Sequence, residues 1–152
     1  MAEEDFMHSL VIYASRSGNT QRIAEAIADG LRAKGSVELQ PAAEAPSVIP
    51  PEIDLVVIGG PTEAHGMTPP MKEFLARLAP DGLSGRRAAA FDTRLRWPLL
   101  LSGSAGAGIT HQLKAMHATV VADEESFFVT RKPELEAGEV ERATSWAAGL
   151  AA

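Results

Sequence analysis

Continuous apolar runs mark the predicted strands of this chain. Such runs are typical of strands that are covered on both faces. Leu10–Ala14 has this character, and Leu55–Ile58 is the next firm strand; Ala88–Phe91 suits a buried strand by its position after Gly85 and two arginines, and Ala118–Ala122 is the last predicted strand. Val37–Leu39 fits a short strand at a sheet edge, and the four prolines between Pro41 and Pro51 predict an extended connection after it. The sequence therefore predicts five strands.

Apolar residues recur every three or four positions between these runs, which predicts amphipathic helices. Thr20–Lys34 places Ile23, Ile27 and Leu31 on one stripe, and Gly35 is its predicted C-cap. The other helices are predicted from three further groups: Met71, Phe74, Leu75 and Leu78 after Thr68-Pro69-Pro70; Ile109, Leu113 and Met116; and Val140, Ala143, Trp146, Ala147 and Leu150 within Glu139–Leu150.

Alternation of strands and helices predicts an α/β fold with a parallel sheet, because each parallel crossover requires a connecting helix. The helices would cover both faces of the sheet, which makes it doubly wound. We expect an N-terminal tail and strand entry at residues 1–8 and a single domain over residues 9–152. Ligands bind such sheets beyond the carboxyl ends of the strands. That rule directs attention to the loops at residues 15–20, 59–67 and 92–103.

The chain of 152 residues contains no cysteine, which excludes disulfides, thiol catalysis and iron–sulfur ligation. His65, His111 and His117 have no carboxylate at metal-ligand spacing, so no metal site is predicted. No G-x-S-x-G elbow indicates a hydrolase, and no catalytic residue is assigned. The chain lacks a long apolar run and a cationic leader, so we expect a cytoplasmic protein without membrane insertion.

Net charge is −6, and residues 1–76 carry the whole imbalance, with five bases and eleven acids against nine of each in residues 77–152. This acidity argues against a nucleic-acid partner, whose phosphates require a basic surface. It favours a basic protein partner, although an acidic surface that serves only solubility explains the charge as well.

The loop at residues 15–20, Ser15-Arg16-Ser17-Gly18-Asn19-Thr20, combines three hydroxyls, an amide and a glycine before a helix. Hydroxyls and the free N–H groups of a helix N-terminus can together bind phosphate. The loop lacks the P-loop lysine and differs from the dinucleotide fingerprint, so nucleotide triphosphate hydrolysis is not indicated. An ordinary strand–helix turn with Thr20 as N-cap is the structural alternative.

The segment from Val11 to Ala24 resembles the signature of the flavodoxin family. The signature positions are filled by Val11, Ile12, Tyr13, Ser15, Gly18, Thr20 and Ala24. The resemblance implies a short-chain flavodoxin-like sheet in the order 2-1-3-4-5. It also implies that FMN is the cofactor, that Ser15, Ser17, Asn19 and Thr20 bind its phosphate through side chains, and that Arg16 and Gly18 contribute backbone N–H groups.

The same resemblance implies that the flavin ring lies between the loops after the third and fourth strands. One loop contributes Pro61, Thr62, His65 and Gly66, and the other contributes Asp92, Thr93, Arg94 and Trp97. Trp97 is either a stacking partner of the ring or a hydrophobic plug under residues 98–101. The second loop lacks the stacking tyrosine that is usual in the family.

Arg94 and Arg96 stand where flavodoxins tend to be acidic. If they face the ring, positive charge favours the fully reduced anionic flavin, and the second reduction potential becomes less negative than is usual. If Arg94 instead pairs with Asp92, the arginine is structural.

We therefore expect an FMN-binding electron-transfer protein that shuttles electrons between a reductase and an acceptor. Two alternatives stay open. One is an FMN-dependent oxidoreductase that acts on a small substrate such as a quinone or a porphyrinogen. The other is a flavodoxin-fold module with weak or no FMN binding that acts through protein partners.

Overall fold

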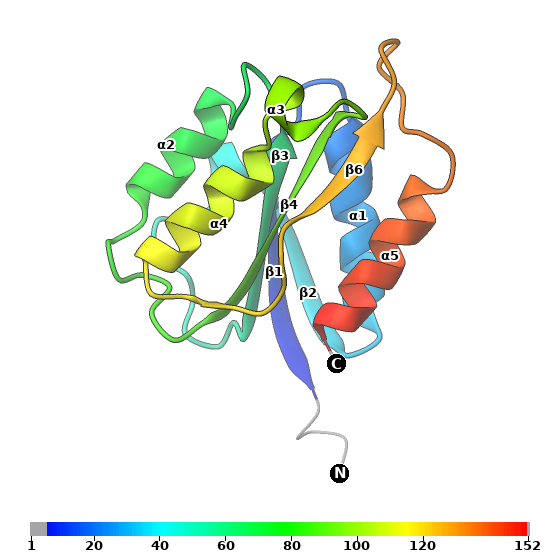
Figure 1. The fold of residues 1–152 in the computed structure, drawn as a ribbon. Helices are drawn as coiled ribbons and strands as arrows, with labels where there is room; N and C mark the ends of the chain where they lie inside the picture. The colour runs from blue at the N-terminus through cyan, green and yellow to red at the C-terminus, as the bar shows by residue number, and fades with distance from the viewer. Residues whose placement is uncertain (1–5, 152) are drawn as a thin grey trace.

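The structure is a computed structural model that describes residues 6–151. At its centre lies a parallel sheet in the order β2-β1-β3-β4-β5, with β6 also paired to β4 (Figure 1). The strands are β1 (Met7–Tyr13), β2 (Gly35–Pro41), β3 (Leu55–Pro61), β4 (Arg87–Leu95), β5 (Thr119–Val120) and β6 (Glu125–Val129). The predicted fold class and strand order are confirmed.

Helices cover both faces of the sheet (Figure 1). They are α1 (Asn19–Arg32), α2 (Pro69–Arg77), α3 (Leu99–Ser102), α4 (Ala105–Ala115) and α5 (Glu139–Leu150), together with the 3-10 turn η2 (Ala42–Glu44). The apolar stripes of α1 and α5 pack into one core layer, and those of α2 and α4 pack into the other. The predicted stripe residues Ile23, Ile27 and Leu31 are fully buried, as the helical spacing required.

The outermost strand differs from the prediction. The expected strand Ala118–Ala122 is only the two-residue β5, and the chain then resumes pairing with β4 as β6, a strand that the sequence analysis missed. Only Phe127 of β6 is fully buried, because this strand lies at the sheet edge. An edge strand needs no continuous apolar run, so the pattern used to find strands did not reveal it.

The boundaries of α1 and β2 also differ from the prediction. The helix begins at Asn19 after Gly18, not at Thr20, and its C-cap is Ala33. Gly35 begins β2, where a Cβ atom would lie 1.8 Å from the carbonyl oxygen of Met7. This glycine is required for close strand packing and does not cap the helix.

Residues 1–5 of the expected tail lie outside the described residues, and β1 begins within the predicted strand entry, at Met7. Among the residues that are described, no helix combines the length and the apolar character needed to cross a membrane.

Candidate functional site

The three loops singled out in the sequence meet at the carboxyl edge of β1, β3 and β4. Parallel strands end at the same edge, so the loops that follow them are neighbours. The backbone N–H of Thr62 donates to the carbonyl of Thr93 at 2.8 Å, which joins the second loop to the third. The hydroxyls of Thr20 and Thr93 also lie 2.8 Å apart, which joins the first loop to the third.

The loop Ser15–Thr20 presents a group of free backbone donors. Gly18 adopts the left-handed conformation, with φ +92°, and forms the N-cap of α1. The Ser15 hydroxyl accepts from the N–H groups of Gly18 and Gln21, at 3.1 and 3.4 Å. Within residues 6–151 the N–H groups of four other loop residues have no acceptor: Arg16, Ser17, Asn19 and Thr20. Free N–H groups at a helix N-terminus attract an anion.

The side chains of Asn19 and Thr20 face the protein. Asn19 is buried and donates from Nδ2 to the Ser17 hydroxyl at 3.2 Å and to the Pro133 carbonyl at 3.1 Å. Thr20 is buried against Thr93. The exposed residues of this loop are Ser15, Arg16 and Ser17, and the guanidinium of Arg16 pairs with Glu63 at 3.4 Å.

Two adjacent cavities lie along the loops. The first, of about 200 Å³, is here called the loop cavity, and the second, of about 250 Å³, the tryptophan cavity. The predicted residues Arg16, Ser17, Asn19, Pro61, Thr62, Thr93 and Arg94 line the loop cavity. Thr62, His65, Arg94 and Trp97 line the tryptophan cavity. Because Thr62 and Arg94 belong to both, the two cavities adjoin.

Five predicted residues line neither cavity: Ser15, Gly18, Thr20, Gly66 and Asp92. The last two shape the loops. The backbone of Gly66 exchanges hydrogen bonds with Glu63 at 3.0 and 2.9 Å, which closes a tight turn. Asp92 is fully buried, and its Oδ2 accepts from the Ser104 hydroxyl at 2.6 Å and from the Gly106 N–H at 2.9 Å. Asp92 therefore holds the N-terminus of α4.

The two arginines of the third loop have different positions. Arg94 lines both cavities, and it donates to the Ser126 hydroxyl at 2.9 Å and to the Trp97 carbonyl at 2.9 Å. Arg96 lines neither cavity and pairs with Glu136 at 2.9 Å, which raises the pKa of its guanidinium. No ion pair joins Arg94 to Asp92 in the described part of the chain, because Asp92 is turned toward α4.

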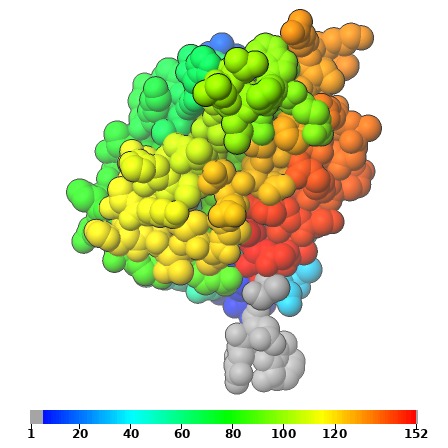
Figure 2. Space-filling model, in the orientation of Figure 1, coloured from blue at the N-terminus to red at the C-terminus, as the bar shows by residue number. Residues whose placement is uncertain are grey.

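Trp97 is 41% exposed at the mouth of the tryptophan cavity, with the Arg131 guanidinium 5.4 Å from its ring centroid. It is not a plug beneath the following leucines, because Leu99, Leu100 and Leu101 are themselves exposed. These leucines belong to the short helix α3, which lies on the surface beside the segment after β6 (Figure 2).

Sequence reasoning missed the contribution of the segment after β6. Val129 and Pro133 line the loop cavity opposite the first loop. The apolar segment Phe127–Val129 and the proline after it were the available signals, but they acquire meaning only once β6 is known to pair with β4.

The comparisons with known proteins agree with this geometry. The flavodoxin domain family matches residues 10–98 of the chain. Flavodoxin 1 from Bacillus cereus is 25% identical, with a TM-score of 0.78 over 94% of this chain and 96% of that chain. A flavodoxin from Streptococcus pneumonia TIGR4 is 20% identical, with a TM-score of 0.79 over 95% of this chain and 97% of that chain.

A flavodiiron protein from Giardia intestinalis is similar over 99% of this chain but only 37% of its own, at 19% identity and a TM-score of 0.72. The structural likenesses below 25% identity establish the fold alone. No curated protein matches the sequence significantly. Because the family match spans more than half of the chain and the sheet has the same architecture as solved flavodoxins, this chain belongs to the flavodoxin domain family.

Proposed function

We propose that this chain binds FMN and shuttles electrons in the cytoplasm between a reductase and an acceptor protein. Membership of the flavodoxin family implies a flavin cofactor. The observation that carries the choice of FMN is the set of free N–H groups in the loop Ser15–Thr20. A phosphate monoester supplies several acceptor oxygens and the negative charge that a helix N-terminus favours.

In this proposal the backbone of the first loop holds the phosphate, with the Ser17 hydroxyl and the Arg16 guanidinium at its edge. The hydroxyl of Ser15 keeps the loop closed by accepting from Gly18 and Gln21. Asn19 and Thr20 act through their N–H groups, while their side chains fix the loop to Pro133 and Thr93. Gly18 has open space where a Cβ would stand, so a ligand can approach its backbone.

The flavin supplies reversible electron transfer when it is bound, and the protein supplies the environment of its ring. The tryptophan cavity, with Thr62, His65 and Trp97, would receive the ring. A half-exposed indole at the mouth suits stacking on a flat ring. Arg94 adds positive charge next to that cavity, which supports a less negative second reduction potential.

A matched pair of variants tests the phosphate assignment. Ser17 is exposed, and its hydroxyl accepts from Asn19 Nδ2, so Ser17→Glu and Ser17→Gln lose the same hydrogen bond and we expect both to fold. Glutamate places a negative charge beside the free N–H groups and repels phosphate, whereas glutamine has the same length without the charge. In titrations followed by flavin fluorescence, we expect Ser17→Glu to weaken FMN binding at least tenfold more than Ser17→Gln does.

Riboflavin, which lacks the phosphate, provides the control ligand. We expect riboflavin to bind more weakly than FMN, and to bind the wild type and both variants with nearly equal affinity. Equal loss of FMN and riboflavin affinity in Ser17→Glu would contradict the phosphate site. Failure of the wild type to bind either flavin would leave an interaction module that keeps the fold without the cofactor.

Electron shuttling is tested separately with the reduced, FMN-loaded protein. Rapid reoxidation by a haem protein or a second flavoprotein, with slow reoxidation by a soluble quinone, is the result expected of an electron carrier. The opposite preference would favour the oxidoreductase that acts on a small substrate. Stopped-flow absorbance at the flavin band measures both rates.

A further inference from the structure

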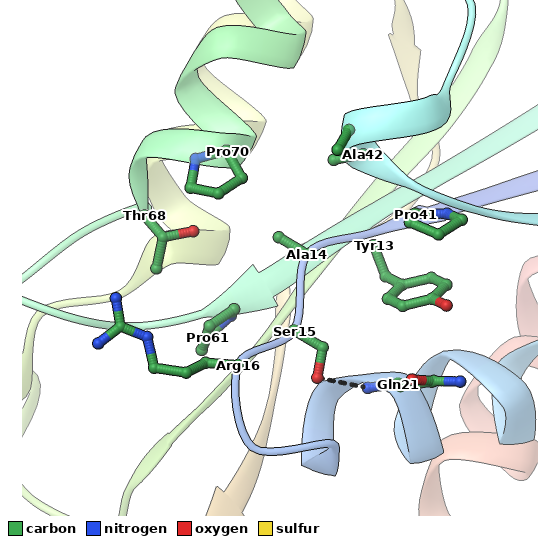
Figure 3. Close-up of a pocket in the computed structure, with 11 residues that line it drawn as sticks. Tyr13, Ala14, Ser15, Arg16, Gln21, Pro41, Ala42, Pro61, Thr68 and Pro70 are labelled. Carbon is green, nitrogen blue, oxygen red and sulfur yellow. Dashed lines mark hydrogen bonds between the residues drawn. The ribbon is translucent and has the colours of Figure 1, made fainter.

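A further cavity lies at the carboxyl edge, on the β2 side of the first loop. Its volume is about 370 Å³, and it opens between the ends of β1, β2 and β3 and the start of α2 (Figure 3). We name it the proline cavity, because Pro41, Pro61 and Pro70 form much of its wall. It shares only Arg16 and Pro61 with the loop cavity. A cavity of this size accommodates a small organic molecule.

Two hydroxyls that line this cavity have no hydrogen-bond partner among residues 6–151, and both oxygens reach the accessible surface. Thr68 is 5% exposed and Tyr13 is 8% exposed, yet neither hydroxyl takes part in a hydrogen bond. Figure 3 shows the Thr68 hydroxyl directed into the space that the Tyr13 ring borders on the other side. An accessible hydroxyl without a protein partner binds water and can exchange that water for a polar atom of a ligand. Both hydroxyls are therefore available to a ligand.

The start of α2 makes this cavity unsuited to an anion. Pro69 and Pro70 occupy the first two helical positions and have no N–H group. The next two N–H groups, of Met71 and Lys72, both donate to the Thr68 carbonyl at 3.1 Å. The first turn of α2 consequently offers no free donor, in contrast to the first turn of α1.

The surrounding charges also favour a neutral ligand. Burial, together with the carboxylates of Glu25 and Glu44, raises the pKa of the Tyr13 phenol, so this hydroxyl remains a donor at neutral pH. The same carboxylates disfavour an anion beside the ring. The guanidinium of Arg16 at the cavity edge is engaged by Glu63.

The shape of the walls indicates a flat ligand. Three proline rings and one tyrosine ring present rigid apolar faces, which suit contact with an aromatic ring. We propose that the proline cavity binds a neutral, single-ring aromatic molecule whose hydroxyl or carbonyl oxygens form hydrogen bonds with Thr68 and Tyr13. The cavity borders the proposed flavin site through Ser15, Arg16 and Pro61, but the proposed binding does not require a bound flavin.

Binding of 4-methoxyphenol, a neutral ring with oxygens at opposite ends, tests the proposal. The full chain is labelled with ¹⁵N, and amide shifts are followed by NMR with and without FMN. We expect saturable shifts at Tyr13, Ala42 and Thr68 in both states. The anion 4-hydroxybenzoate should bind at least tenfold more weakly.

Two variants remove the proposed hydrogen bonds and keep the shape of the wall. Thr68→Val and Tyr13→Phe should each weaken binding of the probe roughly three- to tenfold. Thermal unfolding of both variants should match the wild type, because neither hydroxyl is bonded within the described chain. Thr110→Val is the matched control: it deletes a buried, unpartnered hydroxyl on α4 outside this cavity, and it should leave binding unchanged.

Several results would overturn the proposal. The proposal fails if the probe shifts no amide signal up to its solubility limit. It also fails if the shifted signals belong only to residues of the tryptophan cavity. Tighter binding of the anion would contradict the neutral ligand class. Competition between FMN and the probe would show that the proline cavity belongs to the flavin site. Unchanged affinity of Thr68→Val and Tyr13→Phe for the probe would show that the two hydroxyls do not bind it.

Discussion

Gly30 lies where α1 packs against α5, and the absence of a side chain lets the two helices approach closely. A Cβ atom at this position would lie 2.4 Å from the carbonyl oxygen of Thr144 and 2.9 Å from the Cβ of Ala147. The Thr144 hydroxyl donates to the Ala26 carbonyl at 3.1 Å across the same interface. A side chain at this position would force the two helices apart, so the contact between α1 and α5 requires a glycine.

We expect Gly30→Ala to lower the free energy of unfolding by about 1–3 kcal/mol, because overpacking outweighs the better helix propensity of alanine. Gly149→Ala is the matched control on α5, where nothing lies within 4 Å of the added Cβ. That variant should gain up to about 1 kcal/mol. Urea unfolding followed by circular dichroism measures both changes. Equal stabilisation of the two variants would show that the interface around Gly30 is loose.

At the scale of elements, the start of α5 protects the exposed edge of β6. The Phe128 N–H donates to Oε2 of Glu139 at 2.7 Å, and the Ser126 carbonyl accepts from Arg142. The Phe128 carbonyl accepts from the Glu136 N–H at 2.9 Å. Unpaired strand edges promote association between chains, so these contacts stabilise the sheet and also shield its edge.

The pKa of Glu139 follows from this arrangement. Burial disfavours the charged carboxylate, but hydrogen bonds from Arg142 and from the Phe128 N–H outweigh it and lower the pKa. A carboxyl whose pKa is lower in the folded state stabilises folding fully above its ordinary pKa of about 4.3. This contribution is lost as the pH falls from that value through the lowered pKa.

We expect Glu139→Gln to reduce the free energy of unfolding by about 1–3 kcal/mol at pH 7. The difference from the wild type should shrink as the pH is lowered below about 4.3. Unfolding by urea at a series of pH values measures it. Asp29→Asn, which removes an exposed ion pair with Arg32, is the control and should change little. A Glu139→Gln deficit that persists unchanged at low pH would contradict the role of the charged carboxylate.

At the scale of the whole molecule, the excess of acids in residues 1–76 gives the chain its net charge of −6. Those residues include the first two of the three loops at the carboxyl edge. A negative protein attracts a positive partner over distances that salt shortens. The charge therefore influences how quickly a partner arrives more than how tightly the sheet is folded.

For the reduced, FMN-loaded protein, we expect the rate of reaction with a basic haem protein to fall about tenfold between low and high salt. The rate with ferricyanide, an anionic acceptor, should stay level or rise over the same range. Stopped-flow measurements at constant pH compare the two. A fall of similar size for both acceptors would mean that net charge does not steer the encounter.

The chain by itself determined most of the elements and the first loop. Ile23, Ile27 and Leu31 predicted the buried face of α1, because helical periodicity is a local property that survives in the fold. The segment Val11–Ala24 predicted the family, because the family signature consists of residues that are adjacent in sequence. Gly18, the N-cap of α1, and the hydroxyls before it belong to the same local pattern.

Only the tertiary structure decided which partners those residues meet. Asn19 donates a hydrogen bond to the Pro133 carbonyl, and Asp92 accepts one from the N-terminus of α4. Arg94 lines the two cavities, whereas Arg96 forms an ion pair with Glu136. The sequence contains all these side chains, but their roles depend on residues that are distant along the chain. Strand β6 went unpredicted for the same reason, since an edge strand is defined by its pairing with β4 more than by its own apolar pattern.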